Sequence, residues 1–364
     1  MQKTPLHESH LKAKAKMGEF AGYDMPLFYE GGVMEEHLWT RTKAGVFDVS
    51  HMGQIILEGP EAMALLHTIT PSSFVKTPPM MAKYTVLTNK DGGIIDDLIV
   101  TKITDTKFFA VINAGCKEKD ISWIDENLPD SVEMKRLDDR GLIALQGPAA
   151  EKVLHEVLYL DILQLKYMRM VQIDDLYISR LGYTGEDGFE ISLPAEHAPT
   201  FWERLCEHGD VQPIGLAARD SLRLEMGYCL YGHDIDDTTS PVEADLAWVI
   251  GKDADEFIGS KRILDELENG ASRKRVGVML TDKGVAREGA KILSSEGYEI
   301  GVLTSGGFSP SLQKSIGQGY VPPLYAEEGT EVLLEVRGRQ IKAEISKLPF
   351  LPAKVKTATS KKAG

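Results

Sequence analysis

Cysteines and long apolar segments are scarce in this chain of 364 residues. Its three cysteines, Cys116, Cys206 and Cys229, are far apart and form no CxxC pair, so neither a disulfide framework nor a structural zinc site is expected. No apolar run approaches the roughly 20 residues of a membrane-spanning helix, so no membrane partner is expected. The N-terminus lacks the apolar core of a signal peptide and the pattern of a transit peptide. We expect a cytoplasmic protein, or a mitochondrial matrix protein in its processed form.

The signatures of several common enzyme classes are also missing. No GxSxG elbow, P-loop or GxGxxG motif follows a predicted strand, which argues against the common hydrolases and nucleotide-binding enzymes. His51 and His233 are isolated, and neither has the second histidine four residues away that a helical metal site uses. We therefore expect no bound metal.

Basic residues are outnumbered: 41 Lys and Arg stand against 55 Asp and Glu, a net charge of −14. No nucleic-acid partner is expected, because phosphate binding needs a basic surface. The charge is uneven, since residues 271–364 hold 15 Lys and Arg against 9 Asp and Glu. The C-terminal part is therefore a candidate docking surface for an acidic partner. The alternative is that a disordered basic tail at residues 356–364 supplies much of the excess.

The length predicts two or three domains, and a repeated pattern indicates where they lie. "IILEGPEAMALL" (55–66) and "IALQGPAAEKVL" (143–154) both read as a strand, Gly-Pro and a helix, with proline at the first helical position. They predict two related α+β units with a cleft between them. Beyond residue 270 the pattern changes to short strands with glycine turns, typical of a small β-barrel or sandwich. We expect a body at 1–270, whose second unit spans roughly 53–140, and a barrel at 271–355.

Two adjacent carboxylates, Asp96 and Asp97, lie in the predicted strand "GGIIDDLIV" (92–100). Neighbours on a strand face opposite ways, so Asp97 is expected on the face of Ile95 and Ile99, and Asp96 on that of Leu98. Periodicity alone does not choose which carboxylate lines a pocket. The alternative is that one lies on an exposed edge and the other bonds turn amides.

A second carboxylate and an arginine are further candidates. Glu190, in "GYTGEDGFEISL" (182–193), shares a strand face with Ser192, and this face either meets solvent or lines a cavity where a ligand satisfies the carboxylate. Arg219 lies in the predicted helix "LAARDSLRLE". Its guanidinium either pairs with Asp220, Glu225 or another carboxylate, or binds an anionic ligand.

A dozen short motifs occur in one order between about residues 4 and 352. They are TPLHESH, FAGYDMPLFY, RTKAGVFDVSHMG, GGIIDDLIV, INAGCKEKD, ALQGPAA, GYTGEDGFEIS, GLAARDSLRLEMG, LYGHDID, SPVEADLAWVIGK, TSGGFSPSL and GYVP. Together they resemble the T-protein family of the glycine cleavage system.

The resemblance implies an α+β fold of three domains in a cloverleaf around a central folate cavity, with a C-terminal β-barrel. It implies a tetrahydrofolate-dependent aminomethyltransferase. Such an enzyme takes the aminomethyl group from the lipoyl arm of the H protein and passes its methylene carbon to tetrahydrofolate. The products are ammonia, 5,10-methylenetetrahydrofolate and the dihydrolipoyl H protein, and no metal is needed.

The same resemblance assigns roles to single residues. The essential aspartate of the family matches Asp97, and its folate-contacting glutamate and arginine match Glu190 and Arg219. A carboxylate accepts the neighbouring N3–H and 2-amino group of a pterin, and a fixed carboxylate stabilises a cationic iminium at the migrating carbon. Residues past Pro352 lack the aromatics of other members, so no contact is expected there. Three further positions fall where the cavity lining is expected: Asn113, Tyr84 and Met52.

Two alternatives use a similar folate cavity. One is a folate-dependent demethylase of another methylated amine, but those domains work with a flavoprotein and this chain has no Rossmann glycine motif. The other is a folate-binding accessory protein of iron–sulfur assembly. Cys229 in "MGYCLYGHDID" lies near the cysteine of that class, although the flanking Lys-Gly and Gln-Glu of its motif are missing.

Overall fold

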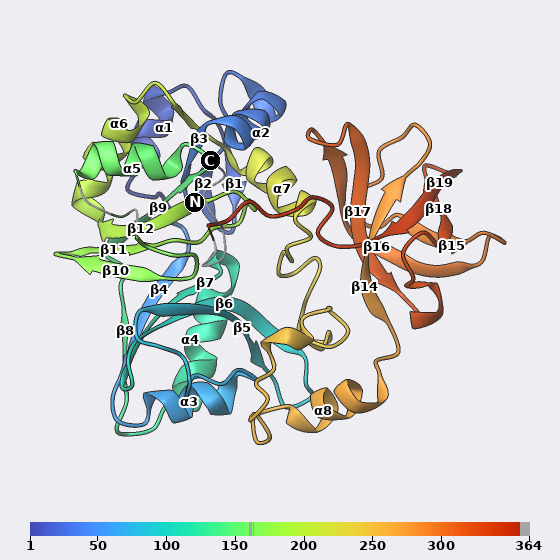
Figure 1. The fold of residues 1–364 in the computed structure, drawn as a ribbon, viewed down its shortest axis with the longest axis horizontal. Coiled ribbons are helices and arrows are strands. Elements are labelled where there is room, and N and C mark those ends of the chain that lie inside the picture. Colours follow the sequence, from blue (N-terminus) through green and yellow to red (C-terminus); the bar gives the residue numbers. More distant parts are fainter. Residues whose placement is uncertain (160–161, 163, 357–364) are drawn as a thin grey trace.

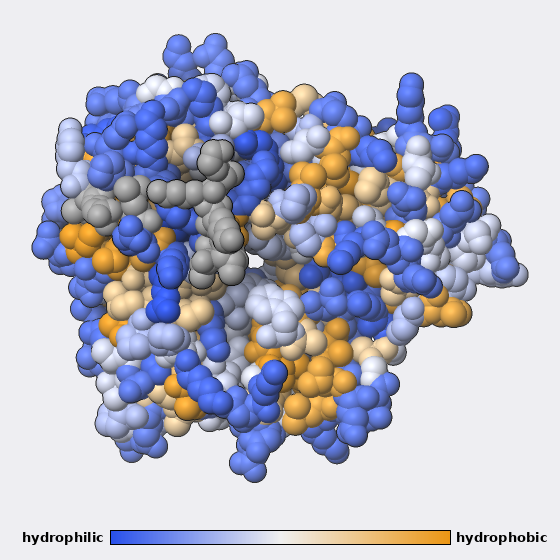
Figure 2. All heavy atoms as spheres, viewed as in Figure 1, coloured by the Kyte–Doolittle hydropathy of each residue, from blue (hydrophilic) through white to orange (hydrophobic). Residues whose placement is uncertain are grey.

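Two α+β units and a β-barrel surround the centre of the protein in a computed structural model, which describes residues 1–159, 162 and 164–356 (Figure 1). Each unit contains one large sheet, and the barrel lies to one side of both. A hollow opens between the three parts in the space-filling view (Figure 2). The predicted fold class, α+β with a C-terminal β-barrel, is confirmed. No helix within the described residues is both long and apolar enough to cross a membrane.

A six-stranded sheet forms the first unit, in the order β10-β11-β12-β9-β3-β13. All its neighbours pair antiparallel except β13 and β3, which are parallel. Apolar residues at helical spacing pack α5 and α6 against one face, and buried Phe201, Trp202 and Leu205 lie on one side of α6. The elements are β3 (Ala44–Asp48), β9 (Arg140–Gln146), α5 (Ala150–Leu158), β10 (Met170–Ile173), β11 (Leu176–Ser179), β12 (Gly188–Pro194), α6 (Ala198–Cys206) and β13 (Val211–Pro213).

A five-stranded antiparallel sheet forms the second unit, in the order β5-β6-β7-β4-β8. Helices α3 and α4 cover its outer face over a core that includes Leu65, Leu98 and Ile124 (Figure 1). The chain enters this unit from β3 and returns from it to β9, so the unit is inserted in the first one. The elements are β4 (Gly53–Glu58), α3 (Ala62–Ile69), β5 (Met81–Thr88), β6 (Ile94–Thr104), β7 (Lys107–Ile112), α4 (Lys117–Glu126) and β8 (Glu133–Arg136).

The inner faces of the two sheets pack against each other. Phe47 and Leu142 from the first sheet and Ile56 and Phe109 from the second share one core, to which α7 (Leu216–Glu225) adds Leu222. The layers are therefore helix, sheet, sheet, helix, with the centre of the molecule between the sheets. The N-terminal elements pack beside this core: α1 (His7–Lys12), β1 (Lys16–Phe20), β2 (Tyr23–Phe28) and α2 (Gly32–Thr42).

A closed six-stranded barrel follows a connecting segment that packs on β5 and β6 through Leu246 and Val249. After the last strand the chain returns to the first unit, where Lys354 N–H donates to the Gly185 carbonyl at 2.7 Å. The elements are α8 (Ser260–Asn269), β14 (Lys274–Leu280), β15 (Lys291–Ser294), β16 (Glu299–Ser309), β17 (Lys314–Val321), β18 (Glu331–Val336) and β19 (Arg339–Ser346). Within the predicted tail, residues 357–364 lie outside the described residues.

The repeated Gly-Pro pattern has one structural role in both units. Gly59 and Gly147 have φ of 155° and 130°, and an added Cβ would lie only 2.0 and 2.2 Å from a carbonyl oxygen, so only glycine fits. The expected position of proline was wrong by two residues. Pro60 and Pro148 lie in the turn before the caps Glu61 and Ala149, because the chain completes the strand-to-helix turn before the first helical residue.

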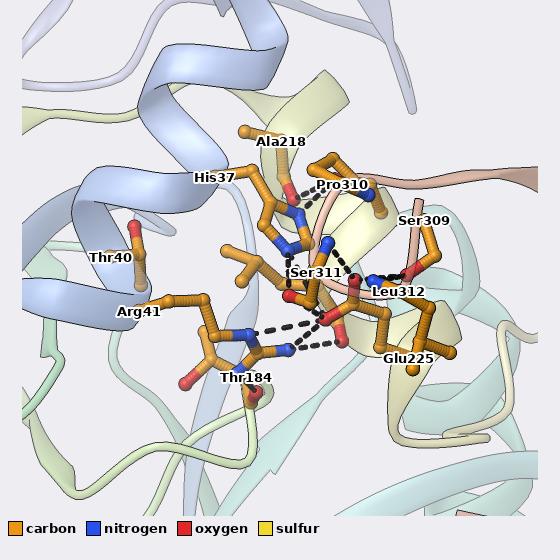
Figure 3. Close-up of polar contacts among 12 residues, drawn as sticks. His37, Thr40, Arg41, Thr184, Ala218, Glu225, Ser309, Pro310, Ser311 and Leu312 are labelled. Atoms are coloured by element: carbon orange, nitrogen blue, oxygen red, sulfur yellow. Dashed lines mark hydrogen bonds and ion pairs between the residues drawn. The ribbon is translucent and has the colours of Figure 1, made fainter. Parts of the chain in front are cut away.

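A buried ionic network joins the barrel to the first unit (Figure 3). Glu225 at the end of α7 accepts hydrogen bonds from Arg41 Nη2 at 2.7 Å and from Ser311 Oγ at 2.9 Å, and His37 Nε2 lies 3.1 Å from it. Its side chain is fully buried. Burial raises the pKa of Glu225, but the hydrogen bond and charge of His37, the Ser309 hydroxyl and the Arg41 charge outweigh it and lower the pKa to about 2.

We expect Glu225→Gln to lower the free energy of unfolding by about 1–3 kcal/mol, because Arg41 loses a charged acceptor and keeps Glu186 as its carboxylate partner, at 3.1 Å. Since folding lowers the pKa of Glu225 from 4.5, this stability is present above pH 4.5 and is lost as pH falls toward 2. Urea unfolding at pH 7 and pH 4 measures the effect, with exposed Glu207→Gln as the matched control. Equal unfolding curves for both variants at pH 7 would contradict this assignment.

Candidate active site

A tight turn positions the start of β6. Asn89 Oδ1 accepts the N–H groups of Asp91 and Gly93, both at 2.9 Å, and Gly92 has φ of 77°. A Cβ on Gly93 would lie 1.8 Å from the Asp237 carbonyl oxygen, so a side chain cannot fit there. The glycine pair therefore lets the connecting segment pack directly against this end of β6.

The register of β6 changes just after the turn. Thr88 pairs with Ile94 while Leu87 pairs with Asp96, so Ile95 has no partner on β5. As a result Ile95 lies in the same core as Leu98, under α3 and α4. The expectation that Ile95 shares a face with Asp97 was wrong for this reason.

Asp97 lies next to the side chains of Asn113 and Tyr84. Its Oδ1 accepts a hydrogen bond from Asn113 Nδ2 at 2.9 Å, and it also accepts one from the Tyr84 phenol. Burial, and next the charge of Asp96, raise the pKa of Asp97 to about 7, although the Tyr84 and Asn113 hydrogen bonds oppose the shift. A carboxylate with this pKa can exchange a proton near neutral pH.

Asp96 points to the helix-covered side of the sheet and is fully buried. Asn113 holds both of its oxygens: the backbone N–H donates to Oδ2 at 3.1 Å and Nδ2 donates to Oδ1 at 2.9 Å. The hydrogen bond from the Asn113 backbone N–H matches the alternative in which one aspartate bonds a backbone amide. Because Asp96 is fully buried, it does not lie on an exposed edge. One Asn113 side chain bonds both aspartates, which strand alternation did not indicate.

A small pocket with a volume of about 10 Å³ lies between the two sheets. Ile99 and Thr101 line it from β6, and because residues two apart share a strand face, Asp97 lies on the same side. Glu190 and Ser192 line it from β12. The polar face of β12 therefore turns into the molecule rather than to solvent.

Glu190 and Arg219 face this region, and Arg219 does not pair with either of its two named candidate partners, Asp220 and Glu225. Asp220 bonds Arg223 at 2.8 Å and Glu225 bonds Arg41, while Arg219 Nη1 is buried with no hydrogen-bond partner in the described part of the chain. Burial raises the pKa of Glu190, and the nearby Arg219 charge opposes it. Burial lowers the pKa of Arg219. Such polar atoms are rare in folded proteins and indicate a site for a bound polar group.

Aromatic side chains surround these groups, and sequence reasoning singled out only Tyr84. Tyr84 stacks on Trp248 with ring centroids 5.5 Å apart, and Trp248 is 67% exposed. Tyr183 stacks on Tyr228 at 5.6 Å and lies 4.8 Å from the Arg219 guanidinium. Tyr183 and Tyr228 each follow a glycine in the stretches quoted above, and this Gly-Tyr pattern was the sequence signal that could have marked them as site residues.

Met52 and His51 occupy the turn between β3 and β4. Met52 is partly buried against the core that contains Phe109 and Val111, two residues of the pocket lining. His51 is buried, and its Nδ1 has no hydrogen-bond partner among the residues that the structure describes; burial lowers its pKa to about 4, so the ring is neutral at pH 7. We see Met52 as part of the wall beside the pocket.

One group of side chains in the described residues lies close enough together to hold a metal ion: Asp96, Cys116 and Asp120. All three are buried. Asp96 already accepts two hydrogen bonds from Asn113, and the Cys116 thiol is in hydrogen-bond contact with it. The expected absence of a metal stays a prediction.

Known proteins match this architecture along almost its whole length. The family model described as the GCVT N-terminal domain matches residues 6–254, and that of the glycine cleavage T-protein C-terminal barrel domain matches residues 273–351. The chain belongs to the glycine cleavage T-protein family. The resemblance seen in the ordered motifs is thereby confirmed.

Relatives in the T-protein family share about two fifths of their residues with this chain. An aminomethyltransferase of Bacteroides thetaiotaomicron is 40% identical over 360 residues, which cover 96% of this chain and 99% of the relative. A probable mitochondrial aminomethyltransferase of Schizosaccharomyces pombe is 42% identical over 362 residues, 96% of this chain and 93% of the relative. The crystal structure of glycine cleavage system aminomethyltransferase T from Bartonella henselae superposes with a TM-score of 0.94 at 42% identity, over 98% and 99% of the two chains.

Proposed function

We propose that the protein is the aminomethyltransferase of the glycine cleavage system. It moves the methylene carbon of an aminomethyl group from the lipoyl arm of the H protein to tetrahydrofolate, leaving ammonia and 5,10-methylenetetrahydrofolate. The observation that carries this proposal is the arrangement of three side chains between the sheets. Arg219 Nη1 is buried without a hydrogen-bond partner among the described residues, Glu190 lines the pocket, and the pKa of Asp97 is raised to about 7.

Glu190 and Arg219 would hold the folate. Glu190 offers two acceptor oxygens, which suits the adjacent N3–H and 2-amino donors of a pterin. Arg219 Nη1 is an unused buried donor for a carbonyl or carboxylate oxygen of the same ligand. Tyr84, Tyr183 and Trp248 provide flat apolar surface for its rings.

Asp97 would carry the transfer step. Its carboxylate can stabilise positive charge on the migrating carbon, and its pKa suits the transfer of a proton to or from folate nitrogen. Asn113 and Tyr84 fix the carboxylate by hydrogen bonds, so the group is oriented before substrate binds. Met52 would add apolar wall.

A transfer assay with lipoylated H protein and tetrahydrofolate tests the function directly. We expect 5,10-methylenetetrahydrofolate and ammonia in equal amounts, and no product when the lipoyl group is absent. The iron–sulfur accessory alternative receives no support from Cys229, which is 5% exposed and whose pKa burial raises to about 12, so its thiol is unreactive at pH 7. Product formation from a free methylated amine would instead favour the demethylase alternative.

The basic C-terminal part would help to dock the H protein, on the premise that this partner is acidic. Exposed charges are screened beyond about 8 Å at physiological salt, so KM for the H protein should rise with ionic strength while kcat stays constant. Kinetics at NaCl concentrations from about 20 to about 500 mM measure this dependence. A chain ending at residue 353 tests whether the tail alone carries the effect. A KM independent of salt would exclude electrostatic docking.

The relatives described above are bacterial or, in Schizosaccharomyces pombe, named as mitochondrial. For this chain we propose the bacterial cytoplasm or the mitochondrial matrix.

A further inference from the structure

A third carboxyl group lies under the aspartate pair and has no role in the proposed function. Asp120 on α4 is fully buried, and neither of its oxygens has a hydrogen-bond donor among the residues that the structure describes. It faces Asp96, since one ligand atom each of Asp96, Cys116 and Asp120 lies within 4.8 Å of the others. A buried carboxylate without donors would be strongly destabilising, so the group needs a proton.

The charge of Lys119 favours the ionised form of Asp120, but within the described residues it forms no hydrogen bond with that carboxyl group. Lys119 Nζ donates instead to the Ile95 carbonyl and to the Tyr231 hydroxyl at 2.8 Å, and it lies over the Tyr231 ring at 4.1 Å. Cys116 contacts Asp96, and burial raises the pKa of its thiol. Asp97 adds negative charge from the adjacent strand position.

Asp96 and Asp120 therefore form a pair that shares one proton. Two facing buried carboxyl groups cannot both be ionised, as their charges repel at short range. Burial, and then the charge of Asp96, raise the pKa of Asp120 to about 11. With the proton on Asp120, its O–H donates to Asp96, and Asp96 has donors from Asn113, Cys116 and Asp120 together.

We propose that Asp120 is a positioning residue, held protonated so that it neutralises half of the buried pair and fixes Asp96, which in turn orients Asn113 against Asp97. The chain of contacts is continuous, because Asn113 Nδ2 donates to Asp96 at 2.9 Å and to Asp97 at 2.9 Å. This inference rests on the proposed role of Asp97. The acid also limits the negative charge next to Asp97 to that of one carboxylate.

Two substitutions of Asp120 distinguish a protonated carboxyl group, which donates a hydrogen bond, from an ionised carboxylate. Asp120→Asn keeps the shape and a donor toward Asp96 at zero charge, so we expect kcat within about threefold of the parent and an unchanged apparent pKa in the pH–rate profile. Asp120→Ala removes the donor and frees Asn113, and misplacement of a reacting group by 1 Å can cost roughly 10²-fold. We expect kcat to fall about tenfold with tetrahydrofolate Kd within about threefold, and the apparent pKa to shift. Asp125→Asn, exposed on the same helix, is the matched control.

Infrared difference spectra at pH 7 test the proton without any assay of activity. The difference spectrum, parent protein minus Asp120→Asn, should show the C=O stretch of a protonated carboxyl group. If this band is present in a parent protein that is inactive in transfer, the proposed function fails while this inference stands. Three results would overturn the proposal: absence of that band, a lowered apparent pKa in Asp120→Asn, or kcat of Asp120→Ala equal to that of Asp120→Asn. Stoichiometric metal in the purified parent, lost in Asp120→Asn, would replace the shared proton with a metal site.

Discussion

Asp97→Asn should lower kcat for methylene transfer by about 10²–10⁴-fold, the largest loss expected from any single change in this protein. The amide keeps the shape of the aspartate and still lies next to Asn113. It has no charge to balance the positive charge on the migrating carbon, and it cannot take a proton. Tetrahydrofolate should still bind, because Glu190, Arg219 and the aromatic side chains are unchanged. Rapid-quench kinetics and calorimetry with the same preparations measure the two quantities.

The pH dependence gives a second readout for Asp97. With its pKa near 7, the parent enzyme should lose activity as pH falls below 7. The sign for stability is opposite: a carboxyl whose pKa rises from 3.8 to about 7 on folding reduces stability as pH increases through that interval. Asp97→Asn should therefore unfold at higher urea than the parent at pH 8 and at equal urea near pH 4.

Asp96→Asn is the control for this assignment. It should lower the unfolding free energy by roughly 1–3 kcal/mol, because the new amide presents donors to Asn113 where an acceptor is needed. Its kcat should fall by at most about tenfold, through disorder of Asn113 rather than loss of the reacting group. A dead Asp96→Asn beside an active Asp97→Asn would reverse the assignment.

Glu190→Gln should weaken tetrahydrofolate binding by roughly 10- to 100-fold, since hydrogen bonds to a charged group contribute about 1.5–3 kcal/mol each. The amide must point its NH₂ group toward a donor edge of the pterin. Calorimetric titration measures Kd, circular dichroism checks the fold, and kcat at saturating folate should stay within a few-fold. Exposed Glu196→Gln is the matched control, and an unchanged Kd for Glu190→Gln would remove this residue from the folate site.

Arg219→Met should weaken folate binding to a similar degree while raising the melting temperature. The parent protein has a buried guanidinium whose Nη1 lacks a partner in the described part of the chain, and replacing it by an apolar side chain removes the cost of burying it. A variant that binds folate normally would show that Arg219 is a structural cation. A variant that loses both stability and binding would show that its charge supports the fold.

Much of the fold could be read from local patterns. Phe201, Trp202 and Leu205 have helical spacing and lie on the buried side of α6. Short strands with glycine turns predicted a small barrel or sandwich in the C-terminal part, which is a closed barrel. The order of a dozen motifs was sufficient to place the chain in its family, which the comparisons confirm. Such features depend on residues close in sequence, so the sequence by itself determines them.

The environment of the site residues depends on which strands and helices pack against each other, and only the tertiary structure determines this packing. Alternation put Asp96 and Asp97 on opposite faces but could not say that α4 brings Asp120 onto one face and that a second sheet encloses the other. It also failed at Ile95, where the change of register breaks the period of two. The site is buried because segments more than a hundred residues apart meet at the centre, and no local pattern carries that information. This burial raises the pKa of Asp97 and leaves Arg219 Nη1 without a hydrogen-bond partner in the described residues.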